Sequence, residues 1–396
     1  MRRISRTLTL SACIGTLVAG AAAPMAQAAD PSSADVAQKA SQDQGDQPSS
    51  MLYGLNNNPD TVKDDDINQA VGKAPATKVL FHEFTQDEVG KAKSDLENTW
   101  DSGSVPILTW ELQEDGNDKK SHLQEIETGQ KDDLIRQEGE MLKEFTAGPD
   151  GNSGTDDDRQ VYLRLGHEMN GDWYSWGAND QNSPNDYVSA FQHVHQQFDQ
   201  VGGLDKSHLQ YMWIPMSMGG NGIASSSNKP GKDYYPGDDY VDWVGVDAYN
   251  RNSGQGWQQP KDVLDKSLKK VSEAAPHKPI AIPEIGTNEG DGKNQWMNDM
   301  WGTASYFTGA NGEKVKMLDY FNNDKNEGKS LGWTKWSAVD RGNQHDGGNG
   351  GDKHMTGASG DPLNVYSAFV DNVNKDNMIG ADGQKHLTDD QFQGNF

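Results

Sequence analysis

The chain contains a single cysteine, Cys13, and that residue lies inside an N-terminal segment that resembles an export leader. A mature protein without this leader holds no disulfide bond, which excludes a small fold stapled by disulfides. Hydrophobic residues make up only 33% of the 396 residues, and the mean hydropathy is -0.87. We therefore expect long polar loops around an ordinary core, and the 11 tryptophans argue against disorder over most of the chain.

Positive charge is also scarce. The sequence has 35 lysines and arginines against 60 aspartates and glutamates, which gives a formal net charge of -25. Such a surface repels polyanions, so nucleic acid is excluded as a partner, and pectin and alginate are disfavoured as substrates. A neutral polysaccharide meets no such repulsion. Acidity alone does not distinguish a glycan-degrading enzyme from any other acidic secreted protein.

The N-terminus has the three parts of an export signal. Arg2, Arg3 and Arg6 precede the apolar run 8–23, and the small residues 26–28 offer a cleavage site. The apolar run is too short and too rich in alanine to serve as a membrane-spanning helix. We expect removal of this signal and secretion of a protein that has no membrane segment.

A lipid anchor on Cys13 is the alternative location, because the residues around it fit a lipoprotein cleavage pattern. Most of the apolar run follows Cys13, whereas a lipoprotein signal places that run before the cysteine.

Residues 29–50 are rich in alanine, serine, glutamine and aspartate and show no apolar period. They predict a flexible linker.

Strand and helix patterns alternate through the rest of the chain. Helical spacing is clear in 187–201 and again in 263–275, and several strand-like runs are almost continuously apolar, as in parallel strands buried on both faces. Eight alternations predict an α/β fold, a (β/α)8 TIM barrel forming one catalytic domain over 51–373, with a peripheral tail over 374–396. A doubly wound sheet is the alternative, but no Gly-rich nucleotide turn follows an early strand. The predicted strands are 51–55, 78–84, 105–110, 161–165, 209–214, 241–246, 279–283 and 332–337.

The segment 161–177 carries the strongest chemical signal. It opens as an apolar strand and ends in Glu168, beside His167 and a group of aromatic residues. Acid catalysis needs a fixed proton donor, and the flat faces of sugar rings stack on aromatic side chains. A zinc peptidase is excluded, because Gly171 stands where the His-Glu-x-x-His motif requires its second histidine. The segment therefore predicts carbohydrate chemistry.

Four blocks of the sequence resemble glycoside hydrolase family 26, whose founding members are bacterial β-mannanases. The blocks are 161–177, 235–249, 278–286 and 332–337, and they fall in the order found in the family. The resemblance extends from about Met51 to about Val373. It implies a retaining endo-glycanase of the clan of (β/α)8-barrel hydrolases.

By this resemblance Glu168 is the general acid/base and Glu284 is the nucleophile. They end the fourth and seventh predicted strands, so both reach the C-terminal face where barrel enzymes hold their active sites. Retention requires carboxyl groups about 5–5.5 Å apart. We expect apolar neighbours such as Trp173 to raise the pKa of Glu168.

The resemblance also assigns residues around the pair. Tyr249 corresponds to a tyrosine that bonds the nucleophile, and Trp336 to the tryptophan beneath the sugar whose bond is cut. Arg164, Tyr249 and His167 are expected to stabilise the charged nucleophile. Further substrate-binding residues, with ordinary core packing as the alternative for each, are Trp110, Trp173 and Trp176.

We expect no metal and no cofactor. The acidic runs 64–66 and 156–158 lack the spacing of a calcium loop and predict solvated loops. We also expect the protein to act as a monomer on a neutral plant-type or microbial polysaccharide.

The substrate stays open between two β-glycans. Many family mannanases carry Glu-Asn-Thr-Gly where this chain has Glu168-Met169-Asn170-Gly171, a form that also occurs in relatives acting on mixed-linkage β-glucan. β-1,4-Mannan is the first choice, and an endo-β-1,3-1,4-glucanase or another β-glycan hydrolase is the alternative. A non-catalytic polysaccharide-binding barrel is disfavoured, because both carboxylates are present.

Overall fold

The computed structural model describes residues 47–396 except 115, 117–118, 253–255, 327–332, 342–349 and 382–385. The predicted export signal, Cys13 and most of the predicted linker lie outside the described residues. The unit that contains the barrel begins at Pro48. Ser49, at the end of the predicted linker, donates from Oγ to the backbone oxygens of Ser305 and Val315, so it is tied to the barrel. Over the described ranges we find no helix with the length and apolar character of a membrane span.

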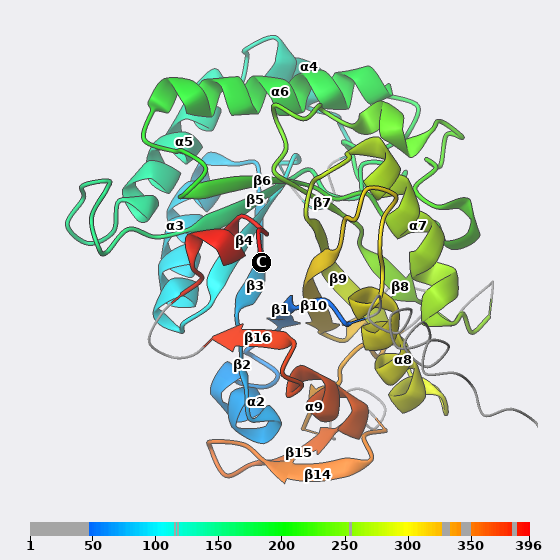
Figure 1. The fold of residues 1–396 in the computed structure, drawn as a ribbon. Coiled ribbons are helices and arrows are strands. Elements are labelled where there is room, and N and C mark those ends of the chain that lie inside the picture. Colours follow the sequence, from blue (N-terminus) through cyan, green and yellow to red (C-terminus); the bar gives the residue numbers. More distant parts are fainter. Residues whose placement is uncertain are drawn as a thin grey trace, which may run out of the picture. The chain divides into compact units, whose positions relative to one another are not determined.

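Parallel strands close into a barrel, which confirms the predicted (β/α)8 fold (Figure 1). Among the described residues the ring has eight strands, and it closes where β1 pairs with β10 from Leu52↔Met317 to Asn57↔Asn322. The strands are β1 (Met51–Asn57), β3 (Thr77–Glu83), β4 (Val105–Glu111), β5 (Val161–Leu165), β6 (Leu209–Trp213), β7 (Trp243–Gly245), β9 (Ile280–Thr287) and β10 (Val315–Asn322).

Helices cover the outside of the ring (Figure 1). The longest, α6, begins with a capping box in which Ser183 and Asp186 satisfy each other's backbone N–H groups, and it buries the apolar face predicted from the sequence. No α-helix lies in the fully described segment between β6 and β7, which holds two 3-10 turns. The helices and turns are α2 (Asp64–Val71), α3 (Gln86–Asp101), α4 (Leu123–Glu127), α5 (Asp132–Thr146), α6 (Pro184–Val201), η1 (Gly219–Asn221), η2 (Gly231–Tyr234), α7 (Pro260–Ala274), α8 (Lys293–Ser305), α9 (Ser367–Val373) and α10 (Asp389–Phe392).

The prediction of the eighth strand is wrong. The barrel is completed by β10, whereas the predicted strand 332–337 follows it and is partly outside the described residues. Its described part includes β12 (Trp333–Thr334), which pairs antiparallel with β11 (Lys325–Asn326). The apolar run of β10 is interrupted by Lys316, Asp319 and Asn322, and this hid the strand from a search for continuous apolar segments. The remaining short strands are β2 (Ala74–Pro75), β8 (Ala248–Asn250), β13 (Val339–Asp340), β14 (Lys353–Thr356), β15 (Pro362–Val365) and β16 (Met378–Ala381).

The C-terminal tail fills the N-terminal end of the barrel, so the expectation that it is peripheral is wrong. Strand β16 pairs in parallel with the start of β1 and antiparallel with β2. The ring of Phe392 is fully buried among residues of the barrel interior. Its backbone oxygen accepts from Tyr162 Oη at 3.0 Å and from Trp243 Nε1 at 3.1 Å. The C-terminus accordingly lies over the middle of the barrel in Figure 1.

The acidic run 64–66 is not a solvated loop. It forms the first turn of α2, and Asp66 is fully buried, where it accepts from Ser359 N at 2.6 Å and Ser359 Oγ at 2.5 Å. These bonds, which are the largest cause of the lowered pKa of Asp66, hold the turn between β14 and β15 against α2. The second run, 156–158, lies in a turn region as expected.

A buried carboxyl group lies inside the barrel wall. Asp319 of β10 is fully buried, and its Oδ1 accepts from Thr77 Oγ1 at 2.9 Å, while Oδ2 has no partner among the described residues. The carboxyl group occupies space beside Gly54, where a Cβ would lie 1.7 Å from Oδ1. Burial raises the pKa of Asp319 to about 8.

We expect Asp319→Asn to stabilise the fold increasingly between pH 4 and pH 8. The unfolded carboxyl ionises near pH 3.9, whereas the folded one keeps its proton to about pH 8, so folding costs more free energy as the pH rises through this window. The amide removes this cost and can still accept from Thr77. The expected gain is about 2–4 kcal/mol at pH 8 and close to zero at pH 3, measured by urea unfolding. A gain that does not depend on pH would contradict this account.

Candidate active site

Both predicted catalytic glutamates line one hollow of about 610 Å³ at the C-terminal ends of the barrel strands. A volume of this order is typical of sites for small ligands. Aromatic and charged side chains share its lining. They include Trp173, Tyr174, Tyr249, Arg251, Phe321, Lys325 and Trp336.

Glu284 lies within β9 and is held on both carboxylate oxygens. Arg164 Nη2 donates to Oε1 at 2.5 Å, and the hydroxyl of Tyr249 donates to Oε2. The carboxylate is almost fully buried. These two donors, one of them permanently charged, fix the orientation of the carboxylate. The predicted contacts of Arg164 and Tyr249 with this residue are therefore present.

The guanidinium group of Arg164 donates hydrogen bonds to three residues in the barrel interior. Besides Glu284, it donates from Nε to Thr109 Oγ1 at 2.7 Å and from Nη1 to both oxygens of Asp247 at 3.0 and 2.9 Å. Arg164 and Asp247 are both fully buried. Asp247 was not predicted as a site residue. A carboxylate directly after the apolar run 241–246 is the signal that could have found it, since the same pattern identified Glu168.

Glu168 lies in the turn after β5, in a very different environment. Its backbone has φ of 52°, a conformation that non-glycine residues rarely adopt, and such strain occurs often at functional sites. The side chain is only 6% exposed. Burial, and secondly the charge of nearby Glu284, raise the pKa of Glu168 to about 7. This group can therefore carry a proton at neutral pH.

Trp173 does not act on Glu168 as predicted. Its indole Nε1 donates to Oε2 of Glu168 at 2.7 Å, and a hydrogen bond to the charged form lowers the pKa of a carboxyl group. The raised pKa comes from the burial of Glu168 itself. Trp173 is also 41% exposed, so it leaves a broad surface facing the solvent at the rim of the hollow.

We expect Trp173→Phe to move the alkaline limb of the pH–activity profile to higher pH. The replacement keeps an aromatic surface but removes the donor that favours ionised Glu168, so the pKa of Glu168 rises. The pH dependence of kcat/KM measures the shift, which we expect to be about 0.5–1 pH unit for one lost hydrogen bond. Tyr306→Phe, at another exposed aromatic residue, serves as the control. An unchanged or lowered alkaline limb would contradict this assignment.

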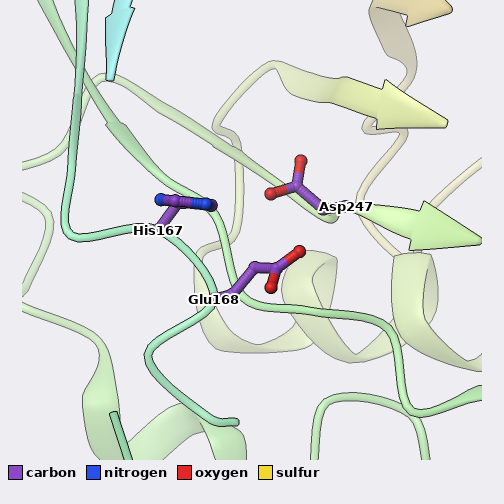
Figure 2. Close-up of side chains that lie close together, drawn as sticks. All are labelled: His167, Glu168 and Asp247. Carbon is purple, nitrogen blue, oxygen red and sulfur yellow. The ribbon is translucent and has the colours of Figure 1, made fainter. Parts of the chain in front are cut away.

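Figure 2 shows His167 and Glu168 from the turn after β5 beside Asp247 from the segment after β7. One ligand-type atom of each lies within 4.8 Å of the others, a spacing that a metal site could use. Arg164 already bonds both oxygens of Asp247, however, so its guanidinium supplies the positive charge that this group needs. Burial, and secondly the charge of Arg164, lower the pKa of His167, which keeps its ring neutral. Its Nε2 contacts the Tyr174 hydroxyl at 3.2 Å.

The model of glycosyl hydrolase family 26 matches residues 50–312. This range covers the barrel strands from β1 to β9 and both glutamates. The chain belongs to glycosyl hydrolase family 26.

Two relatives of the chain have names that describe different activities. The chain is 26% identical over 208 residues to Endoglucanase H of Acetivibrio thermocellus, which covers 51% of this chain and 20% of that protein. It is 28% identical over 188 residues to the mannan endo-1,4-beta-mannosidase of Bacillus subtilis, with 45% of this chain and 40% of the relative covered. The matches thus span less than half the length of these relatives.

Solved structures of family 26 share the fold at low sequence identity. A modular endo-beta-1,4-mannanase from Cellulomonas fimi matches 86% of this chain and 73% of its own at a TM-score of 0.58 and 18% identity. The catalytic domain of a Bacillus sp. JAMB-750 endo-beta-1,4-mannanase matches 85% and 88% at a TM-score of 0.59 and 16% identity. These likenesses support the barrel and carry no argument on substrate.

Trp336, from the fourth block of the family resemblance, lines the hollow beside Tyr249. Its ring centroid lies 4.9 Å from that of Tyr249. Its backbone oxygen accepts from Tyr320 Oη, and the preceding carbonyl, of Lys335, accepts from the fully buried Lys293 Nζ at 2.6 Å. These bonds fix the segment that presents the indole to the hollow.

The structure does not bring Trp110 and Trp176 to the hollow. Trp110 lies on the outer face of β4 between Phe84 and Phe198, because side chains alternate along a strand and Thr109 points inward to Arg164. Trp176 is fully buried, stacks on Tyr174 and donates to the backbone oxygen of His167 at 2.8 Å. Both therefore pack behind the residues that face the hollow.

Two cations of the hollow were not predicted. Arg251 lies over the rings of Tyr249 and Trp336, at 5.4 and 5.8 Å from their centroids. Lys325 Nζ lies 4.4 Å from the ring centroid of Phe321. Neither position follows an apolar strand run directly, so no sequence pattern marked them. They place positive charge at the active site of an otherwise acidic protein.

Proposed function

We propose that this family 26 protein is a secreted, retaining endo-β-glycanase that hydrolyses β-1,4-mannan-type polysaccharides. One observation carries the proposal: two buried glutamates line the same hollow in opposite surroundings. Glu284 accepts from Arg164 and Tyr249, whereas burial raises the pKa of Glu168 to about 7. Such a division separates a nucleophile from a proton donor in glycoside hydrolases.

In the first step Glu284 attacks the anomeric carbon, while Glu168 gives its proton to the departing glycosidic oxygen. A covalent glycosyl-enzyme results, and the leaving saccharide takes the proton. In the second step Glu168, now ionised, removes a proton from water, and the resulting hydroxyl attacks the anomeric carbon and frees Glu284. Trp336, which the family resemblance places beneath the reacting sugar, lines the hollow but is only 1% exposed, with the guanidinium of Arg251 over its ring. The proposal needs no cofactor.

The substrate proposal draws on the relatives. The Bacillus subtilis relative is named a mannan endo-1,4-beta-mannosidase, and this favours mannan. The Acetivibrio thermocellus relative is named an endoglucanase, and this supports a mixed-linkage β-glucan as the second candidate. The sequence Glu168-Met169-Asn170-Gly171 is compatible with either.

Release of reducing ends from linear mannan, glucomannan and barley mixed-linkage glucan tests both candidates. Activity on the two mannans but not on the barley glucan supports the mannanase, and the reverse supports the glucanase. The absence of activity on all three polysaccharides contradicts the proposal and favours a non-catalytic polysaccharide-binding barrel. The stereochemistry of the first product, followed by NMR, tests retention.

Secretion rests on residues 1–28, which lie outside the described part. Expression of the full chain in a bacterial host is expected to release into the medium a protein that begins at Ala29. A membrane-bound protein that begins at Cys13 would instead support the lipid anchor.

A further inference from the structure

The wall of the barrel is open between its first two strands. β1 and β3 share one bridge, Gly54↔Thr77, whereas β3 and β4 pair over seven positions from Thr77↔Val105 to Glu83↔Glu111. Above the bridge, the two strands diverge. The opening holds a second hollow of about 660 Å³, which we name the wall slot.

The wall slot runs along the barrel rather than across its top. Lys78 and Leu80 of β3 line the bottom of the slot, and Asp95 and Asn98 of α3 line one of its sides. The opposite side is formed by Asn58 and Pro59, between β1 and α2, and by Asp64, the first residue of α2, which accepts a hydrogen bond from Lys78 Nζ at 2.5 Å.

The wall slot is continuous with the catalytic hollow. Tyr174, Phe321 and Lys325 line both spaces. Lys325 Nζ lies 4.4 Å from the ring centroid of Phe321 and 5.9 Å from that of Phe81, which also lines the slot. A molecule bound at the catalytic glutamates can therefore extend into the slot without leaving the protein surface.

Two polar side chains at the upper end of the slot have no hydrogen-bond partner within the described chain. Asn56 of β1 is only 6% exposed, and no bond joins its amide to another described residue. Glu111, at the end of β4, is likewise without a hydrogen bond in the described part, although it lies close to the charges of Glu83 and Arg164. Neither side chain has a fully buried polar atom that lacks a partner, so both are open to water or to ligand hydroxyl groups in the slot.

We propose that the wall slot binds a side-chain sugar of a branched β-glycan whose backbone lies across the catalytic hollow. Amide and carboxyl groups face sugar hydroxyls there, and Leu80 and Phe81 offer apolar surface to the ring. The slot follows the strand direction, whereas the backbone must cross the top of the barrel past Glu168 and Glu284. A stiff β-linked backbone does not turn down the wall, but a single branch can. This inference rests on the proposed glycanase function and specifies its substrate as a branched polymer.

Asn98→Trp tests the slot, because Asn98 is exposed on α3 and lines the slot but not the catalytic hollow. The indole fills the slot, and Ser94→Trp, which adds an indole to the exposed surface of α3 outside the slot lining, is the matched control. With galactomannan as the branched substrate and unbranched mannan as the linear one, we expect kcat/KM of Asn98→Trp to fall at least about tenfold on galactomannan. We expect it to stay within about twofold on linear mannan, and Ser94→Trp to resemble the wild type on both.

Equal loss on both polymers, or no loss on either, would overturn the branch site. If the wild type cleaves neither mannan, the proposed function fails, and a binding measurement then tests the branch site independently. In calorimetric titration with a galactosylated manno-oligosaccharide and its unbranched counterpart, the wild type should prefer the branched ligand and Asn98→Trp should lose that preference. Equal binding of the two ligands by the wild type overturns the inference.

Discussion

Glu284→Ala is expected to reduce glycan hydrolysis by about three to six orders of magnitude while the barrel stays folded. On the proposed mechanism the loss is large, because the carboxylate forms the covalent bond that divides the reaction into two steps, and removal of enzyme nucleophiles causes effects of this size. The alanine substitution also removes the acceptor of the hydrogen bonds that Arg164 and Tyr249 donate to Glu284. Initial rates on the best polymer, with circular dichroism to check the fold, measure the effect.

Chemical rescue separates the loss of a nucleophile from general damage. With an aryl glycoside that has a good leaving group, added azide should restore turnover of Glu284→Ala and give a glycosyl azide of inverted configuration. Glu140→Ala on the exposed surface of α5 should retain wild-type activity. Full activity of Glu284→Ala would remove this residue from the mechanism.

Arg164→Met is expected to cost about 3–5 kcal/mol of folding free energy as well as most of the activity. The guanidinium is fully buried between Asp247 and Glu284, so its removal leaves two buried carboxylates without their shared cation. Denaturant unfolding measures the stability, and kcat/KM measures the catalytic loss. Arg136→Met, at an exposed ion pair on α5, should leave stability nearly unchanged, because exposed ion pairs are screened by solvent.

A second substitution tests the origin of that cost. Asp247→Asn added to Arg164→Met removes one of the unpaired charges, so we expect the double variant to regain part of the lost stability. Activity should stay low, because Glu284 still lacks its charged donor. Additive losses in the double variant would show that the two side chains do not act as a pair.

The sequence identified most of the fold because apolar strands and amphipathic helices alternate with ordinary periods. It failed at β10, where Lys316, Asp319 and Asn322 break the apolar run, and at the tail, where Phe392 is a single large apolar residue in a polar segment. Neither outcome follows from local pattern, since both depend on contacts with strands more than 200 residues earlier.

The candidate site shows the same division between local and distant information. Glu168 and Glu284 were found because each ends an apolar strand within a family block. Trp110 was placed at the site although its neighbours on β4, Thr109 and Glu111, alternate with it and point inward. The wall slot could not be predicted, because it arises from how β1 and β3 diverge after a single bridge.

The buried position of Phe392 determines how late the barrel can close while the chain is being synthesised or exported. Strand β1 needs β10 and β16 as neighbours, and the N-terminal end of the barrel needs α10. A polypeptide that leaves the ribosome or a membrane pore N-terminus first therefore holds an open sheet until α10 has emerged, long after β1. Contacts of such long sequence separation also slow folding. Until α10 arrives, the strands of the barrel stay extended enough to pass through a narrow pore.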